Sequence, residues 1–120
     1  MPVAVTKSKT SAKEKMLTIR ELFGLSQEAL AQSLGVSSRT VARWEEGMAS
    51  PSPLALTRLR LLMQIREKAG KLFKVKEADT WLRTPNPVLR GQTPLERLRA
   101  PGGLEEVADL LGRIEWGIPT

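Results

Sequence analysis

Leu25–Gly47, LSQEALAQSLGVSSRTVARWEEG, has the pattern of two short helices joined by a tight turn. Serine is a favoured N-cap, so Ser26 and Ser37 each predict a helix, the first ending at a Gly35 turn and the second near Glu46. The positions expected to face a core are apolar at helical spacing: Leu30, Ala31, Leu34, Val41 and Trp44. Two helices this short cannot bury a core alone, so they must pack on neighbouring helices.

The second of these helices is predicted to read DNA. Arg39 and Arg43 lie one turn apart on its outer face, beside Ser38. In a helix-turn-helix the second helix enters the major groove, where arginine bound to guanine is the commonest base-specific contact. The polar side chains expected to contact phosphates at the groove edge are Gln27, Ser37 and Thr40. The first of them also begins a helix, whose free N–H groups favour an anion.

Apolar periodicity predicts further helices on both sides of this stretch. One runs from about Lys13 to Phe23, and another from Pro53 to about Lys71, with Ser52 as its N-cap. The later helix is apolar on two faces, formed by Leu56, Leu59 and Met63 and by Leu61 and Ile65. A helix apolar over most of its circumference packs on two sides. One face should cover the earlier helices, and the other should contact the C-terminal part or a second copy.

The second half of the chain is also predicted to be helical. A short helix is expected over 76–83, a loop over 84–87, and a helix start at a capping box formed by Thr93 and Glu96. The last helix should run from Leu104 to Trp116, with an apolar stripe of Leu104, Val107, Ala108, Leu111 and Ile114. Since no segment alternates as a strand would, the fold class is predicted to be all-α.

Charge divides the chain unevenly. Residues 1–74 contain 13 Lys and Arg against 6 acidic residues, a net charge of +7, whereas residues 75–120 contain 6 against 7, a net charge of −1. A basic half is the expected footprint of nucleic-acid binding. We therefore predict three parts: a disordered basic arm over 1–12, a DNA-binding helix-turn-helix domain over 13–74 and a C-terminal domain over 75–120.

Composition excludes several classes of site. The 120 residues include no cysteine and no histidine, so ordinary zinc sites, cysteine nucleophiles and histidine acid–base relays have no residues to use. We predict no enzyme, metal or cofactor. No apolar run reaches the length of a membrane span, and the N-terminal residues lack the apolar core of a secretory signal. A cytoplasmic location is expected.

The quoted stretch closely resembles the helix-turn-helix of the Xre and phage-repressor family, over roughly Lys13 to Leu62. The matching positions are Leu25-Ser26-Gln27, Leu30-Ala31, Leu34-Gly35-Val36-Ser37, Val41, Trp44-Glu45 and Gly47. The resemblance implies a phage-repressor-like bundle in which Arg20 pairs with Glu45. It also implies phosphate contacts by Gln27, Ser37 and Thr40, and base contacts by Ser38, Arg39 and Arg43.

Residues 81–117 resemble the C-terminal toxin-binding domain of the MbcA/ParS/Xre antitoxins. The matching positions are Trp81-Leu82, Asn86-Pro87, Leu89, Gly91, Pro94-Leu95, Leu98, Gly103, Val107, Leu110-Leu111-Gly112-Arg113-Ile114 and Gly117. The resemblance implies a partner toxin of the RES type, which consumes NAD and whose active-site cleft the antitoxin covers. The implied contacts are loop 86–91 with Leu110, Arg113, Trp116, Ile118, Pro119 and Thr120. Trp81, Leu98, Val107, Leu111 and Ile114 are expected in the core.

Two interpretations follow for the whole chain. The first is a type II antitoxin that neutralises its toxin through the C-terminal domain and represses its own promoter, binding an inverted-repeat operator as a homodimer. The second is a stand-alone repressor whose C-terminal domain dimerises or senses a ligand. From the pattern alone, the apolar residues near the C-terminus suit either a cover for the domain's own core or an anchor for a partner. A toxin gene beside this one would favour the first interpretation.

Overall fold

The computed structural model describes residues 12–117 of the chain. Its elements, in chain order, are α2 (Ala12–Phe23), α3 (Gln27–Leu34), α4 (Ser38–Glu45), α5 (Pro53–Leu82), the 3₁₀-helix η1 (Pro87–Leu89), α6 (Pro94–Arg99) and α7 (Gly103–Glu115). Strand pairing within 12–117 is limited to one bridge between Asn86 and Gln92. The all-α prediction is therefore confirmed. The predicted arm falls outside the described residues except for Ala12, which begins α2.

Side-chain caps fix where the short helices begin. Ser26 Oγ accepts a hydrogen bond from the Ala29 N–H at 3.0 Å, and Ser37 Oγ accepts from the Thr40 N–H at 3.1 Å. Between these helices Gly35 adopts the left-handed conformation, with φ of 75°, that a side chain would disfavour. The predicted capping box is also present, because Thr93 and Glu96 exchange hydrogen bonds of 2.8 and 3.0 Å. The helix starts at 27, 38 and 94 follow from these local bonds.

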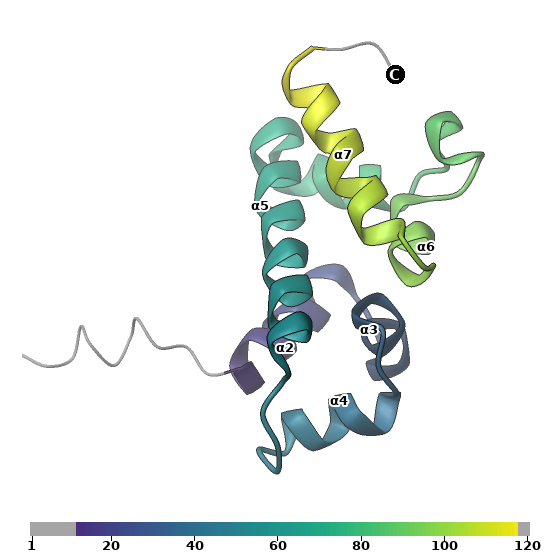
Figure 1. Cartoon of the computed structure of the whole chain (residues 1–120). Coiled ribbons are helices and arrows are strands. Elements are labelled where there is room, and N and C mark those ends of the chain that lie inside the picture. The colour runs from purple at the N-terminus through teal and green to yellow at the C-terminus, as the bar shows by residue number, and fades with distance from the viewer. Residues whose placement is uncertain (1–11, 118–120) are drawn as a thin grey trace, which may run out of the picture.

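Helices α2 and α3 pack against α5, and α4 packs against α2 and α3 (Figure 1). The side chains predicted to face this core are buried: Leu30, Ala31, Leu34, Val41 and Trp44. Met16, Ile19 and Phe23 of α2 are buried with them. Helix α4 lies at one end of the molecule, at the bottom of Figure 1, while α7 lies along the far part of α5. The two helices with predicted binding surfaces are therefore at different ends.

Helix α5 consists of two helical parts that meet at a kink. The label spans 30 residues, and Lys74, with φ of 67° and ψ of 160°, leaves the helical conformation between the two parts. The predicted end near Lys71 lies three residues before this kink. The short helix expected over 76–83 is the part of α5 after the kink, and it ends at Leu82. Across the interruption the rings of Phe73 and Trp81 stack, with centroids 5.3 Å apart.

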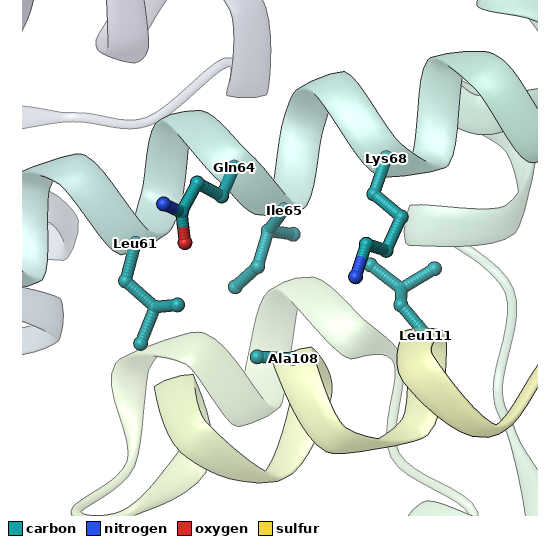
Figure 2. Close-up of a pocket in the computed structure, with 6 residues that line it drawn as sticks. All are labelled: Leu61, Gln64, Ile65, Lys68, Ala108 and Leu111. Atoms are coloured by element: carbon teal, nitrogen blue, oxygen red, sulfur yellow. The ribbon is translucent and has the colours of Figure 1, made fainter. Parts of the chain in front are cut away.

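One face of α5 packs on the C-terminal half. Figure 2 shows Leu61 and Ile65 of α5 facing Ala108 and Leu111 of α7. The cavity left between these helices measures about 60 Å³, well below the roughly 300–1,000 Å³ typical of small-molecule sites. This packing confirms that one apolar face of the helix contacts the C-terminal part.

The second apolar face predicted for α5, formed by Leu56, Leu59 and Met63, is only partly buried. Leu62 is fully buried, whereas Met63 is 36% exposed and lines an open groove with Leu22 of α2. The expectation that Met63 faces the core is therefore wrong, because the neighbouring Leu62 takes the inward position. Leu59 is buried as predicted and Leu56 is half-buried.

Several contacts tie the two halves together. Arg99 of α6 donates from Nε to Gln32 Oε1 of α3 at 2.7 Å. Lys68 of α5 pairs with Glu115 of α7 at 3.1 Å. Helices α3 and α6 also pack against each other. The helix-turn-helix and the C-terminal helices therefore share α5 and a common interface.

Candidate nucleic-acid interface and C-terminal contact surface

Helix α4 presents two arginines that make no internal bonds. Arg39 and Arg43 are exposed, and within residues 12–117 neither forms an ion pair or a side-chain hydrogen bond. Behind them, Val41 is fully buried and Trp44 is 5% exposed, so the helix is anchored on its opposite face. Ser38 is exposed at the start of the helix. Two guanidinium groups on a fixed, uncovered helix can donate to an external anion or to base edges.

The hydroxyls of Ser37 and Thr40 lie at the N-terminal end of α4. Ser37 Oγ caps the helix through the Thr40 N–H and lies 2.9 Å from Thr40 Oγ1. Each hydroxyl keeps further hydrogen-bonding capacity, and Ser37 is exposed while Thr40 is partly so. They thus flank the exposed arginine side chains, and their phosphate contacts stay a prediction.

Gln27 takes part in a network that the sequence analysis predicted only in part. Arg20 Nη1 donates to both carboxylate oxygens of Glu45, at 2.9 and 3.1 Å, which confirms the pair implied by the family resemblance. Gln27 Nε2 donates to Glu45 Oε1 at 2.8 Å. This last bond joins residues 18 positions apart on α3 and α4, so no local spacing pattern could indicate it.

The end of α7 carries the main exposed aromatic side chain of the C-terminal half. Trp116 is 80% exposed at the C-cap of α7. Arg113, one turn earlier, is exposed and pairs with Asp109 at 3.2 Å. The other predicted contacts, Ile118, Pro119 and Thr120, lie outside the described residues. Tryptophan and arginine are enriched among the residues that contribute most to protein–protein binding.

Leu110 requires a correction. It was predicted to contact the toxin, but it is 2% exposed and belongs to the core. The physical reason is helical spacing, since Leu110 lies three residues after the buried Val107 and widens the inward stripe of α7. Leu98, Val107 and Leu111 are buried as predicted, while Trp81 and Ile114 are half-buried against the core.

The 86–91 loop is shaped by its own hydrogen bonds and is joined to α7 by one ion pair among the described residues. Asn86 Oδ1 accepts from the Val88 N–H at 2.9 Å, and Arg90 adopts a left-handed conformation with φ of 60°. Glu106 of α7 pairs with Arg90 at 3.4 Å and with Arg97 at 2.7 Å. The loop therefore has a defined shape beside the outer face of α7, and its role in toxin binding stays a prediction.

The described residues carry no group of three or more acidic, histidine or cysteine side chains that could hold a metal ion. In the same part of the chain, every helix is too short or too polar to cross a bilayer.

Two family models match consecutive parts of the chain. Residues 16–67 match the helix-turn-helix model, and residues 69–117 match the model of the antitoxin Xre/MbcA/ParS C-terminal toxin-binding domain. The boundary between the two matches falls within α5. Together they account for nearly all the described residues.

Known antitoxins and one solved structure are similar to this chain. The mycobacterial cidal antitoxin MbcA of Mycobacterium tuberculosis is 28% identical over 98 residues, covering 82% of this chain and 86% of MbcA. Antitoxin HigA-2 of Vibrio cholerae is 37% identical over 62 residues, covering 52% of this chain and 60% of HigA-2. A chain in the crystal structure of the M. tuberculosis MbcT–MbcA toxin–antitoxin complex shares the fold, with a TM-score of 0.61 and 24% identity over 92% of this chain and 99% of that chain. The chain belongs to the helix-turn-helix antitoxins that carry an Xre/MbcA/ParS C-terminal toxin-binding domain.

Proposed function

We propose that this antitoxin works through two separate surfaces: the end of α7 binds and inhibits its toxin, and α4 represses the promoter of its own operon. The observation that carries the proposal is the placement of two different kinds of exposed side chain at different ends of one packed chain. Arg39 and Arg43 are uncovered on α4, and Trp116 is uncovered at the end of α7. These helices lie at different ends of the molecule (Figure 1).

The DNA-binding part of the proposal assigns roles to six residues. Arg39, Arg43 and Ser38 read base edges, and Gln27, Ser37 and Thr40 contact phosphates. Support comes from the match to the helix-turn-helix model and from the absence of internal partners for both arginines in the described part of the chain. A homodimer would place two copies of α4 on inverted half-sites about 34 Å apart, one turn of DNA.

The toxin-binding part of the proposal concerns a RES-type toxin that consumes NAD. Support comes from the family of the C-terminal domain, and from the relative MbcA, which is found in a complex with MbcT. In this assignment Trp116 and Arg113 contact the toxin together with residues 118–120 and loop 86–91. The antitoxin acts as a binding protein in the cytoplasm, where its toxin and operon are, and performs no catalysis itself.

A co-expression experiment with the full chain tests this function. The reading frame beside this gene is expressed alone and with the antitoxin, while growth and cellular NAD are measured. The proposal predicts that the neighbour alone arrests growth and depletes NAD, and that the antitoxin restores both. Growth arrest without NAD loss would exclude the RES-type assignment. A harmless neighbour would instead favour a stand-alone repressor.

A further inference from the structure

A buried carboxylate lies directly behind the predicted phosphate contact of the DNA-reading half. Glu45, 8% exposed, accepts a 2.8 Å hydrogen bond from Gln27 Nε2 and two from Arg20 Nη1. We propose that Glu45 is a positioning residue for DNA binding, which holds the carboxamide of Gln27 in the orientation that presents an N–H to a phosphate. The proposal rests on the DNA-binding function proposed above and adds a role for Glu45 beyond its pairing with Arg20.

The side-chain amide of Gln27 is asymmetric. A glutamine side chain has one end that donates and one that accepts, whereas an ionised carboxylate only accepts. Nε2 of Gln27 must therefore face Glu45, because a rotated amide would place its oxygen against the carboxylate oxygens. Nε2 carries two hydrogens, and the bond to Glu45 uses one. The second hydrogen remains to donate to an acceptor outside the protein, and a phosphate oxygen is such an acceptor.

The position of Gln27 suits this task. It is the first residue of α3, and Ser26 Oγ caps the N–H of Ala29, while the N–H groups of Gln27 and Glu28 bond to no group of the described residues. The N-terminus of a helix also favours an anion. The amide N–H and the helix N-terminus can therefore donate to the same phosphate group.

The charge of Glu45 would repel a phosphate if it stood alone. Arg20 removes this difficulty, because its guanidinium contacts both carboxylate oxygens and also donates from Nε to the Leu25 carbonyl at 3.1 Å. The carboxylate is thus compensated by a cation whose orientation is itself fixed. Glu45 can orient Gln27 without placing an uncompensated negative charge beside the DNA.

The test compares two neighbouring glutamates. Glu46 is exposed and follows Glu45 directly, but it forms no side-chain hydrogen bond or ion pair within residues 12–117. Loss of an acidic side chain near DNA normally strengthens binding by lowering repulsion. We expect Glu46→Ala to bind a duplex spanning the chain's own promoter as tightly as the wild type or more tightly. Glu45→Ala should instead bind about tenfold more weakly, as Gln27→Ala should, because a hydrogen bond to a phosphate is lost.

The double variant Gln27→Ala/Glu45→Ala separates positioning from a purely structural role. If Glu45 acts through Gln27, the double variant binds no more weakly than either single variant. Additive losses would overturn the proposal, as would a Glu45→Ala variant that binds like Glu46→Ala. Failure of the wild-type chain to bind the duplex would instead overturn the underlying DNA-binding function.

If the Glu45→Ala variant does not fold, Glu45→Gln provides a second test of the proposal. Its side-chain oxygen still accepts from Gln27 Nε2, while the charge pair with Arg20 is lost. We expect a lower melting temperature but an affinity within about twofold of the wild type, measured where circular dichroism shows the variant to be folded. A tenfold loss of affinity in the folded variant would overturn the proposal.

Discussion

The arginines of α4 differ from those of the C-terminal half in whether they have a partner within the protein. On α4, Arg39 and Arg43 have no internal partner among the described residues. In the C-terminal half, by contrast, every arginine binds an acceptor of the chain: Arg83, Arg90, Arg97, Arg99 and Arg113 bind Asp79, Glu106, Glu106, Gln32 and Asp109, respectively. Unpaired arginine side chains can bind the phosphates of DNA, which is a polyanion. A surface whose charges are already paired and which exposes Trp116 is better suited to binding another protein.

This difference shows that net charge by itself says little about binding. The two halves differ by several charges, yet the more useful observation is whether each cation already has a partner. An arginine paired with a carboxylate must lose that bond before it can bind DNA, whereas Arg39 and Arg43 lose only water. The following predictions test this comparison, in order of decreasing effect.

Alanine substitutions at two glycines of α7 should affect the stability of the C-terminal half very differently. A Cβ on Gly103 would lie 1.5 Å from the Arg97 carbonyl oxygen, whereas a Cβ on Gly112 would meet no atom within 4 Å. Gly103→Ala should lower the free energy of unfolding by about 3 kcal/mol or more, because the backbone of α6 or α7 must move. Gly112→Ala should leave it unchanged or raise it by up to about 1 kcal/mol.

Urea denaturation of both glycine variants measures this difference. Equal stabilities would mean that α6 and α7 do not approach as closely at Gly103 as described. A stability loss at Gly103 should also weaken toxin neutralisation, since α7 carries the proposed contact surface.

Trp116→Ala should weaken toxin binding and change the stability of the fold very little. We expect toxin affinity to fall by about 2 kcal/mol or more, because a tryptophan at the centre of an interface contributes heavily. Stability should change by less than about 0.5 kcal/mol, as for other surface positions. Met48→Ala is the matched control, since Met48 is a 67% exposed apolar residue after α4, at the DNA-reading end. Calorimetry against the toxin would contradict the assignment if both variants bound equally well.

Arg43→Ala should weaken binding to the operator by about 1–3 kcal/mol and relax sequence preference. Arg113→Ala serves as its control, because Arg113 is equally a surface arginine but is paired with Asp109. Anisotropy titrations with operator and random duplexes give the comparison. An equal loss on both duplexes would reassign Arg43 to a phosphate contact, and a loss for Arg113→Ala would undermine the distinction between free and paired arginines.

Arg99→Ala should have the smallest effect. Its hydrogen bond to Gln32 is exposed, so we expect a loss of about 0.5–1.5 kcal/mol in unfolding free energy. A double-mutant cycle with Gln32→Ala should recover most of that loss as coupling. The absence of coupling would show that this bond does not hold the halves together.

The fold was largely predictable because its helices begin at local signals. Ser26, Ser37 and Thr93 each cap the helix that their sequence context indicated, and these bonds span only three residues. The two helical parts of α5 were predicted, but no glycine or proline marks the kink at Lys74 that separates them. Leu110 was predicted to contact the toxin but is buried, because the buried face of α7 is wider than the predicted apolar stripe.

The residues of the candidate site could be predicted where they belong to a family motif. Contacts outside that motif could not be predicted. The outer face of α4 and the pair Arg20–Glu45 follow from the helix-turn-helix pattern. The bond from Gln27 to Glu45 and the bond from Arg99 to Gln32 join residues 18 and 67 positions apart. Such contacts depend on how helices pack, which hydrophobic spacing does not specify in enough detail.

If the two ends of this folded chain bind different partners, their activities can be lost separately. Both operator affinity and rescue from the toxin are measured for Arg39→Ala/Arg43→Ala and for Trp116→Ala in the full chain, because α5 packs with both halves. We predict that the arginine variant loses operator binding and still rescues growth, while the tryptophan variant binds the operator and rescues poorly. Loss of both activities in either folded variant, or the reverse pattern, would contradict this separation of activities.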